Sequence, residues 1–506
     1  MIDYNQKKFL IVGGGTAGWI TALYLNKIFP KNKITLIESS EIGILGAGEG
    51  TTPHFVDFLE KVGINFSDFI KNTKATIKTG IKFTNWHGDN TSYFHPFADG
   101  DSLSIGSGWI EKKDLFAIDR IAHGKNLDDI ILSNLCSVQN KTKHRYDESN
   151  DLFLTPGAIA LHFDARLVAN YFKEVATNRG VVRIDSKVTK FNLDDENLNI
   201  TSVELEDKQN VFCDFIFDCT GFSRKIIGEI YKQKWIDYKE SLPVDKAFPF
   251  FLENKTETIP PYTEAIAMKY GWVWKIPVQG RYGCGYVFDS SYVSDDDIRK
   301  EIQETFGEVE IPRNFSFKAG FYENAWMKNC VAIGLSSGFI EPLEATSIWV
   351  SLRSLTLLLR DYQTAIFDDD ENVKMLFNEH IRSFNNEIKD FIQLHYLTER
   401  NDSPFWKEYR IKNKIVNSIS EMENAKCLHE SIRLNYKHFQ NFHPYYVFAG
   451  VKFYNTNMFK KYFDLALSYP INKNYNEELE KFISELNFFA DFKATDHYKF
   501  LKQICK

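Results

Sequence analysis

The sequence lacks the features that would place it among nucleic-acid-binding or membrane proteins. Its 61 Lys and Arg residues against 68 Asp and Glu give a net charge of −7, so no global basic field attracts nucleic acid. No uninterrupted apolar run reaches membrane-spanning length. The start, MIDYNQKKFLIVGGG, passes from a polar leader into a strand and does not resemble a signal peptide. We therefore expect neither nucleic-acid nor membrane partners.

Cysteine is also scarce. The seven cysteines are odd in number and scattered along the chain, at positions 136, 213, 219, 284, 330, 427 and 505. This usage is typical of reduced thiols and predicts a cytoplasmic location. None shows metal-ligand spacing, and the histidines lack a paired motif such as H-E-x-x-H, so we expect no metal site.

What the chain does contain is enough apolar material for a large core. It has 506 residues, of which 43% are hydrophobic, 25% charged and 15% aromatic. These values predict one big domain or two to three smaller ones. Repeats, low-complexity tracts and long linkers are missing, so the parts of the fold are expected to interleave.

Hydrophobic periodicity gives a coarse order of elements. KKFLIVGGGTAGWITALYLNKIF predicts a strand, a glycine turn and a helix, and NKITLIESS predicts the next strand of a βαβ unit. Residues 55–75 are expected to be helical and 80–150 irregular. A helix and a β segment are expected over 162–191, strands over 197–290, and helices from 348 to about 435.

A dinucleotide-binding motif opens the chain. Gly13, Gly15 and Gly18 form G-x-G-x-x-G between a strand and a helix, and Glu38 ends the second strand. The glycines allow close backbone approach to a pyrophosphate at the helix start, which includes Thr16 and Ala17. Glu38 can accept hydrogen bonds from ribose hydroxyls. The motif alone does not separate NAD from FAD, and a glycine turn without ligand is the alternative.

Two later segments favour FAD. FIFDCTGF, from residue 215, and NCVAIGLSSGFIEPLEATSI, from residue 329, are each a buried strand ending in small residues. Here the chain resembles the flavin-dependent monooxygenase superfamily, in which such strands return to the same flavin. The resemblance adds Val188, Leu335 and Ile348 to the flavin-binding residues. No second G-x-G-x-x-G with a following acid appears, so we expect reduced flavin to come from a separate reductase.

The stretch GWVWKIP carries two tryptophans two residues apart. Alternate side chains of a strand share a face, so Trp272, Trp274 and Ile276 are expected to form one wall, followed by Pro277. Taken alone, this wall is as well explained by ordinary core packing as by a functional screen.

W-x-W-x-I-P is a signature of the flavin-dependent halogenases, which this chain resembles from end to end. Further matching stretches are KTGIKFTNW, FHPF, HFDA, DCTGF, GFIEPLEAT, HYLTERNDSPFW and HPYY. The resemblance implies that reduced FAD, O2 and a halide (chloride, bromide or iodide) yield hypohalous acid, which halogenates a small aromatic substrate elsewhere. It also implies that the tryptophan wall keeps the substrate away from the flavin.

The resemblance assigns the reacting groups. Lys78 matches the essential lysine, whose ammonium can hydrogen-bond hypohalous acid; a neutral amine would form a haloamine instead. Its reference pKa of about 10.4 favours the ammonium. Glu344 matches a carboxylate near the target carbon, where it positions the oxidant or takes the ring proton. Glu341 is not expected to take this role. The halide site is placed at Thr346 and Ser347.

The chain departs from the family at the halide site. It reads P-L-E-A-T-S where the family usually reads P-L-E-S-T-G, so Ala345 replaces a serine and Ser347 a glycine. Bromide or iodide is therefore hypothesised to be used better than chloride.

The substrate residues depart as well. His95 and Phe97 match residues that sandwich an indole in tryptophan halogenases, and Tyr445 and Tyr446 match paired tyrosines near the amino-acid end of that substrate. At the position of a glutamate that meets the substrate ammonium, this chain has Lys452. A lysine would repel an ammonium by roughly 1 to 4 kcal/mol at contact. We expect poor activity on free tryptophan and better activity on indoles, phenols or other electron-rich arenes.

The expected fold is α/β, a Rossmann-like FAD-binding fold with interleaved β-sheet and a largely α-helical C-terminal region. Residues 1–347 are expected to form the FAD-binding module, with substrate-facing segments at about 80–150 and 240–290, and residues 348–506 the helical substrate-binding region. Self-association is left open. The alternatives to a halogenase are a flavin monooxygenase that hydroxylates its substrate and a non-catalytic flavin-binding protein.

Overall fold

The computed structural model of the chain describes residues 6–42, 49–97, 103, 110–147, 152–153, 158–413, 415, 417–431 and 443–505. The chain forms two compact units, each assembled from three segments. The first comprises Met1–Lys74, Phe163–Tyr238 and Lys318–Asn386, and the second comprises Ala75–His162, Lys239–Phe317 and Glu387–Lys506. The first unit thus draws on both sides of residue 347, where the sequence suggested one boundary.

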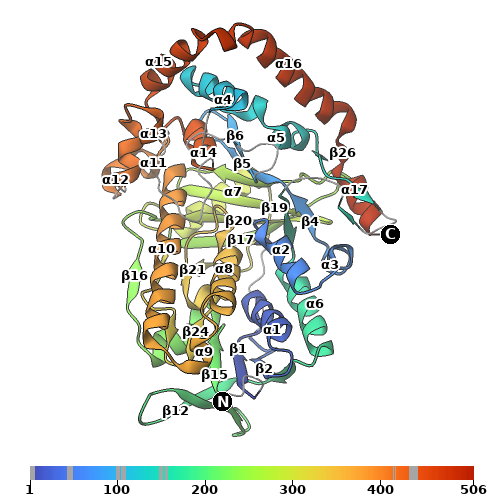
Figure 1. Cartoon of the computed structure of the whole chain (residues 1–506), viewed down its shortest axis with the longest axis vertical. Helices are drawn as coiled ribbons and strands as arrows, with labels where there is room; N and C mark the ends of the chain where they lie inside the picture. Colours follow the sequence, from blue (N-terminus) through green and yellow to red (C-terminus); the bar gives the residue numbers. More distant parts are fainter. Residues whose placement is uncertain are drawn as a thin grey trace. The chain divides into compact units, whose positions relative to one another are not determined.

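A six-stranded sheet forms the centre of the first unit (Figure 1). Its order is β11 (Val182–Asp185), β2 (Lys33–Glu38), β1 (Lys8–Val12), β15 (Phe215–Asp218), β24 (Cys330–Ala332) and β23 (Trp326–Met327). All neighbours pair in parallel except β23 and β24. The central strands are apolar and buried because elements cover both faces of a parallel sheet.

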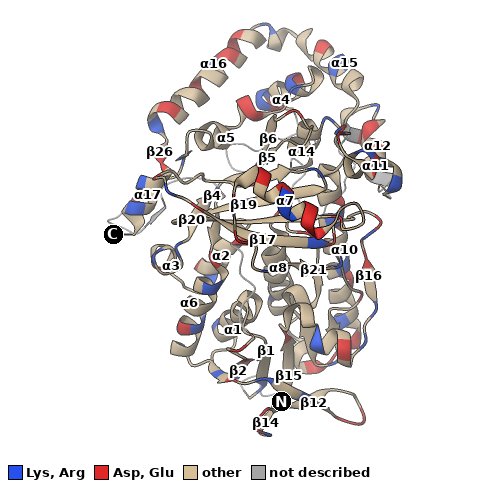
Figure 2. Ribbon diagram, turned by 180° about the vertical axis from the view of Figure 1, so that it is seen from behind, with Lys and Arg blue, Asp and Glu red and all other residues tan. Residues whose placement is uncertain are grey.

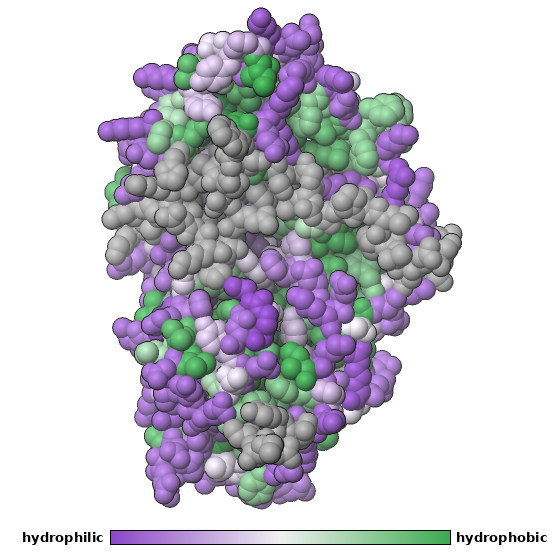
Figure 3. Space-filling model, in the orientation of Figure 1, coloured by the Kyte–Doolittle hydropathy of each residue, from purple (hydrophilic) through white to green (hydrophobic). Residues whose placement is uncertain are grey.

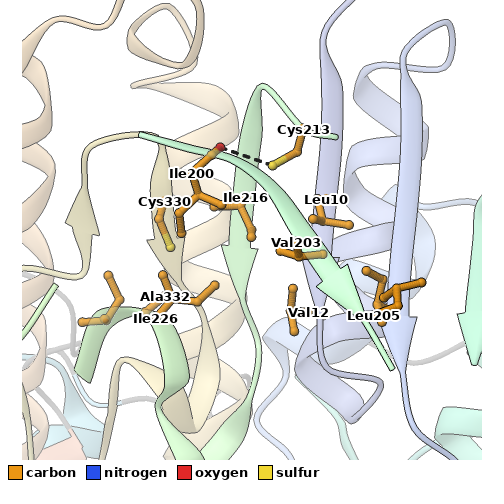
Figure 4. Packing of buried hydrophobic residues seen from close by; sticks show 12 residues of the cluster. Leu10, Val12, Ile200, Val203, Leu205, Cys213, Ile216, Ile226, Cys330 and Ala332 are labelled. Carbon is orange, nitrogen blue, oxygen red and sulfur yellow. Dashed lines mark hydrogen bonds between the residues drawn. The ribbon is translucent and has the colours of Figure 1, made fainter. Parts of the chain in front are cut away.

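Helices and a small sheet form the other layers of the first unit. Helix α1 (Thr16–Ile28) packs against α6 (Ala165–Asn178) and α8 (Thr346–Arg360). The small antiparallel sheet consists of β12 (Val188–Leu193), β13 (Ile200–Leu205) and β14 (Asn210–Phe212). It packs on the parallel sheet through a core cluster that joins residues of β13 to residues of β1 and β15. Figure 4 shows Val203 of β13 beside Leu10 and Val12 of β1, and Ile200 of the same strand beside Ile216 and Cys330. The expected α/β fold is confirmed.

The remaining elements of the first unit connect these layers. They are α2 (His54–Lys61), α3 (Phe66–Thr73), the π-helix Lys225–Ile230, β16 (Trp235–Asp237), β22 (Gly320–Tyr322), β25 (Gly338–Phe339) and α9 (Ala365–Asp368). Residues 55–75, predicted as helical, hold two helices, because Gly63 takes a φ of +66° between them. Helix α10 (Glu371–His395) continues from the first unit into the second.

The second unit is built on a seven-stranded sheet. Its order is β21 (Phe315–Ser316), β17 (Lys246–Glu253), β20 (Arg281–Phe288), β19 (Gly271–Val278), β18 (Thr263–Ala267), β5 (Gly80–Thr84) and β6 (Ser92–Pro96). Only β18 and β5 pair in parallel. Helix α7 (Asp295–Phe306) contributes Ile298 and Ile302 to a core with Val273, Cys284 and Tyr286 of this sheet. The three aspartates of its first turn appear red in Figure 2.

Further helices complete the second unit. They are α4 (Lys112–Ala122), α5 (Leu132–Ser137), α11 (Pro404–Lys412), α12 (Asn417–Glu423), α13 (Leu428–Ser431), α14 (His443–Val451), α15 (Thr456–Leu467), α16 (Tyr475–Phe488) and α17 (His497–Ile504). Two short strands, β4 (Thr76–Lys78) and β10 (Ala160–Phe163), pair antiparallel. The expectation of an irregular segment over 80–150 is wrong for β5, β6, α4 and α5, because tertiary packing stabilises these short elements.

Hydrophilic side chains cover most of the described surface in the view of Figure 3, and hydrophobic ones form small groups. None of the described helices is long and apolar enough to cross a membrane.

Candidate flavin, halide and lysine sites

The glycines between β1 and α1 have different surroundings. Gly13 has a φ of +117°, and a Cβ there would lie 2.1 Å from the carbonyl oxygen of Cys219. A Cβ on Gly18 would lie 1.9 Å from the carbonyl oxygen of Gly13. A Cβ on Gly15 would meet nothing within 4 Å. Gly13 and Gly18 therefore serve backbone packing, whereas Gly15 leaves open space at the start of α1, where a pyrophosphate approaches in dinucleotide-binding folds.

Glu38 lies against the same turn. A Cβ on Gly14 would lie 1.6 Å from its Oε2 atom, and its Oε1 atom accepts a hydrogen bond of 2.6 Å from Nε of Arg183. The carboxylate is thus fixed beside the glycine turn in the position expected for a ribose acceptor. Arg183 was not anticipated, because its contact arises only from the pairing of β11 with β2. The turn and this carboxylate fit a dinucleotide such as FAD.

A half-buried acid that sequence reasoning missed lies at the first residues of α1. Thr16 Oγ1 donates a 3.3 Å hydrogen bond to Oε2 of Glu49, and burial raises the pKa of Glu49 to about 7. Ala17 contacts the turn at Gly334, where a Cβ would lie 2.8 Å from the Ala17 Cβ. The next residue, Leu335, is half-buried and its carbonyl accepts a hydrogen bond from Arg224. Val188, the first residue of β12, is partly buried and packs against the hydrophobic core of the first unit.

The start of α8 carries the residues assigned to halide. Ala345 takes the left-handed conformation, with φ 54° and ψ 37°, and no side chain caps the helix by a hydrogen bond. Thr346 is buried and Ser347 half-buried at this helix start, where backbone N–H groups favour anions. Glu344 and Ile348 are both buried. Glu341, which we did not favour, is buried as well.

Aromatic packing fixes the first turn of α8. The Trp349 ring stacks on the His54 ring with centroids 5.0 Å apart, and meets the Phe384 ring edge-on at 4.7 Å. Burial lowers the pKa of His54, so this imidazole is neutral near neutral pH. The stacking holds Thr346 and Ser347 in place from the side of α2.

The tryptophan wall forms in the second unit as the alternation predicted. Val273 joins the core with α7, so Trp272, Trp274 and Ile276 share the other face of β19. The two indoles meet edge-to-face with centroids 6.4 Å apart. Trp272 Nε1 donates a 3.1 Å hydrogen bond to the hydroxyl of Tyr396.

The indole of Trp274 lies over a glycine. Gly285 pairs with Trp274 across β19 and β20, and a Cβ there would lie 2.1 Å from Cζ2 of the indole. Within the described residues, the buried Nε1 of Trp274 has no hydrogen-bond partner. Such donors are uncommon away from functional sites. Gly285 therefore leaves room for the Trp274 indole, and the G-C-G stretch opposite the tryptophans was its signal.

Lys78 is fully buried at the end of β4. Its Nζ atom lies 4.9 Å from the centroid of the Phe97 ring, which is attractive for an ammonium. Burial and the nearby Lys78 lower the pKa of His162 well below its usual value, so this histidine stays neutral. Thr76, two residues before Lys78, donates a 2.6 Å hydrogen bond to the carbonyl of Pro277. This bond ties the strand of the lysine to the strand of the tryptophans.

A second aromatic group surrounds His95, which is buried on β6. Its Nε2 atom is 2.9 Å from Nδ1 of His443, and its ring centroid is 6.4 Å from that of Tyr446. Tyr445 is fully buried and packs on Phe448, with centroids 4.7 Å apart. The structure therefore brings His95 and Tyr446 together, with His443 as an unanticipated member.

Lys452 differs from this group in its exposure to solvent. It follows the last residue of α14, has a φ of +58° and is exposed. Its charge is solvated, which weakens its field on a bound substrate.

Comparisons with known proteins agree on one family. Residues 8–463 match the tryptophan halogenase family. The chain is 30% identical over 437 residues to tryptophan 6-halogenase SttH of Streptomyces toxytricini, covering 81% of this chain and 82% of that protein. It is 31% identical over 485 residues to tryptophan 7-halogenase RebH of Lentzea aerocolonigenes, covering 88% and 89%.

Solved structures give the same result. The flavin-dependent halogenase BrvH from Brevundimonas sp. BAL3 superposes with a TM-score of 0.86 at 28% identity, covering all of both chains. Together with the glycine turn, the buried lysine and the tryptophan wall, these matches show that the chain belongs to the tryptophan halogenase family and is an enzyme of the flavin-dependent halogenase class.

Proposed function

We propose that the chain uses reduced FAD from a separate flavin reductase, O2 and a halide to halogenate a small electron-rich arene. The observation that carries this proposal is the fully buried Lys78 beside Phe97, on a strand hydrogen-bonded to the strand of the tryptophan wall. Burial of a lysine is costly, and chains retain such groups mainly for function.

The glycine turn would hold the cofactor. Gly15 admits the pyrophosphate, Thr16 and Ala17 begin the helix that faces it, and Glu38 accepts from the ribose. Leu335 and Ile348 would lie by the flavin ring, and Val188 supports the fold from the core side. When bound, reduced FAD activates O2 so that a halide is oxidised to hypohalous acid.

The first turn of α8 would hold the halide. Thr346 and Ser347 present backbone N–H groups at an uncapped helix start, which binds an anion without a permanent cation. Because the hydroxymethyl group of Ser347 adds a donor and changes the shape of the site, we propose that bromide or iodide is used in preference to chloride.

Lys78 and Glu344 would act on the substrate. The Lys78 ammonium donates a hydrogen bond to hypohalous acid, which weakens the halogen–oxygen bond. The arene carbon attacks the halogen, the carbon–halogen bond forms as the halogen–oxygen bond breaks, and the departing hydroxide takes a proton from the Lys78 ammonium and leaves as water. A carboxylate at Glu344 accepts the proton that the ring carbon loses, so the charges balance.

A flat arene would lie among His95, Phe97 and Tyr446. All three rings offer surfaces on which an arene can stack. His95 and Tyr446 also offer polar groups, the imidazole nitrogens and the hydroxyl. Because Lys452 is exposed, its repulsion of a substrate ammonium would lie near the lower end, about 1 kcal/mol. We propose neutral or anionic indoles and phenols as preferred substrates over free tryptophan.

The proposal is tested by supplying the purified chain with reduced FAD, O2 and either chloride, bromide or iodide, alone and in competition. Mass spectrometry then reads the products from indole, a phenol and tryptophan. We expect halogenated indole to exceed halogenated tryptophan about 5-fold, as 1 kcal/mol implies, and brominated product to exceed chlorinated. Hydroxylated arene without halogen would identify a hydroxylase, and no product at all a flavin-binding protein.

A further inference from the structure

Strand β4, which carries Lys78, is only three residues long, and among the described strands it pairs with β10 alone. Lys78 lies opposite Ala160, Ile77 opposite Leu161, and Thr76 opposite His162. The backbone N–H of Ile77 donates instead to Nε2 of His497, at 3.1 Å. Among the described residues, an imidazole rather than a second strand thus accepts the backbone N–H of Ile77, the residue directly before Lys78.

His497 is suited to this task because its own position is fixed. It is fully buried at the start of α17, its Nδ1 atom lies 2.8 Å from the carbonyl oxygen of Ile259, and its backbone N–H donates to the carbonyl of Asn140. An Nδ1–H that donates to Ile259 leaves the Nε2 lone pair for Ile77. Burial lowers the pKa of His497 to about 4, so the acceptor persists at neutral pH.

The other contacts of β4 anchor the neighbouring residues rather than Ile77. Thr76 is held by Pro277 and His162, and Thr79 donates both its N–H and its hydroxyl to the carbonyl of Pro261. Between these anchors, the Ile77 N–H next to the lysine donates to His497.

We propose that His497 is a positioning residue for halogen transfer, which holds the backbone of β4 so that the Lys78 ammonium is aimed correctly. This inference rests on the proposed role of Lys78. The family match covers residues 8–463, so His497 and α17 lie beyond the matched residues. Displacing a reacting group by about 1 Å can cost about 100-fold in rate.

The test compares three variants of the full-length enzyme. His497→Phe keeps a buried ring but removes both hydrogen bonds, and His497→Gln retains a carbonyl that can accept from Ile77. Leu501→Ala is the matched control, because Leu501 is buried one turn later on the same helix. Each is assayed for halogenated arene per flavin oxidised, for hypohalous acid captured by a cyclic 1,3-diketone, for FAD affinity and for thermal unfolding.

We expect His497→Phe to lower the arene yield per flavin about 10-fold or more, while captured hypohalous acid rises and FAD affinity stays within about 2-fold. His497→Gln is expected to recover most of the yield. Leu501→Ala is expected to unfold at a lower temperature yet keep the wild-type yield. If His497→Phe does not fold, His497→Asn replaces it, since its shorter amide does not reach Ile77.

The inference is overturned if His497→Phe, or His497→Asn in its place, keeps the wild-type yield of halogenated arene per flavin oxidised. It is also overturned if Leu501→Ala lowers this yield as much as the His497 variant does. Lys78→Ala is measured in parallel. If that variant still halogenates the arene, the role of Lys78 itself is wrong. If it is inactive while the His497 variants are normal, only the positioning role fails.

Discussion

At the scale of single residues, the glycine turn before α1 separates packing from ligand binding. Side chains are excluded at Gly13 and Gly18 by backbone carbonyls and at Gly14 by Glu38, but not at Gly15. Gly15 has φ −73° and ψ −177°, which any residue adopts. Among the described residues, neither strain nor crowding therefore explains a glycine at position 15, whereas the pyrophosphate of the proposed FAD would explain it.

Two alanine substitutions distinguish these roles. Gly15→Ala is expected to leave the free energy of unfolding of the cofactor-free protein within about 1 kcal/mol, while FAD affinity falls about 10-fold or more. Gly18→Ala is expected to lower the free energy of unfolding by at least about 2 kcal/mol, because its Cβ clashes with the Gly13 carbonyl. Urea unfolding and flavin fluorescence titration measure both. Equal loss of stability in the two variants would contradict the assignment.

The sequence pattern was enough to locate this turn and Glu38, since both follow from a strand, a glycine motif and a helix in register. It was not enough to distinguish the role of Gly15 from that of Gly18. Crowding at these glycines depends on the backbone carbonyls that follow β1 and β15, which lie side by side only in the folded sheet. Arg183 and Glu49 could not be predicted from the sequence for the same reason, because each is far in sequence from its partner and belongs to no local motif.

At the scale of elements, the hairpin of β19 and β20 presents the tryptophans on one face and core residues on the other. The register that places Gly285 beneath Trp274 makes room for the indole. Alternation along a strand made this wall predictable from the sequence. The anchoring of β4 by Pro277 and His497 was not predictable, because hydrogen bonds between distant segments leave no periodic signal.

Gly285→Ala is expected to displace the Trp274 indole, because the new Cβ would lie 2.1 Å from Cζ2. We expect a shifted tryptophan fluorescence spectrum and about a 10-fold lower yield of halogenated arene per flavin oxidised. Cys284→Ala is the control, since Cys284 faces the core with α7 and its loss costs stability without touching the wall. An unchanged yield in Gly285→Ala would show that the position of this indole is unimportant.

At the scale of the whole molecule, the half-buried Asp128 and the fully buried His497 are expected to give opposing pH dependences of stability. Burial raises the pKa of Asp128 to about 7 and lowers that of His497 to about 4. The stability from Asp128 is present below its unfolded pKa of 3.8 and is lost as the pH rises to 7. The stability from His497 is present above 6.5 and is lost as the pH falls to 4. Between about pH 4 and 6.5 the two oppose each other.

Single variants expose each dependence. Relative to the wild type, Asp128→Asn is expected to make the free energy of unfolding rise with pH between 4 and 6.5, by up to about 1.4 kcal/mol per unit. His497→Gln is expected to shift this slope by a similar amount in the opposite sense. Urea unfolding at several pH values measures both, and parallel curves for the wild type and both variants would contradict the burial effects.

The α/β class and the family were accessible from the sequence because their motifs are local. The division into two units was not, since each unit gathers three separated segments and compactness is a property of the folded chain. By sequence position, Glu344, Thr346 and Ser347 belong to the first unit, and Lys78 and the tryptophan wall belong to the second.

The central claim is that an oxidised halogen species formed with the flavin is used at Lys78. The most direct measurement quantifies two products of one reaction with reduced FAD, O2 and bromide. These are the halogenated arene and the hypohalous acid captured by a cyclic 1,3-diketone. The measurement compares the wild type with Lys78→Ala and with Lys82→Ala, a half-buried lysine four residues on. We predict that Lys78→Ala loses arene halogenation about 100-fold or more but still yields captured hypohalous acid, while Lys82→Ala behaves as the wild type. Arene halogenation that persists in Lys78→Ala would contradict the account.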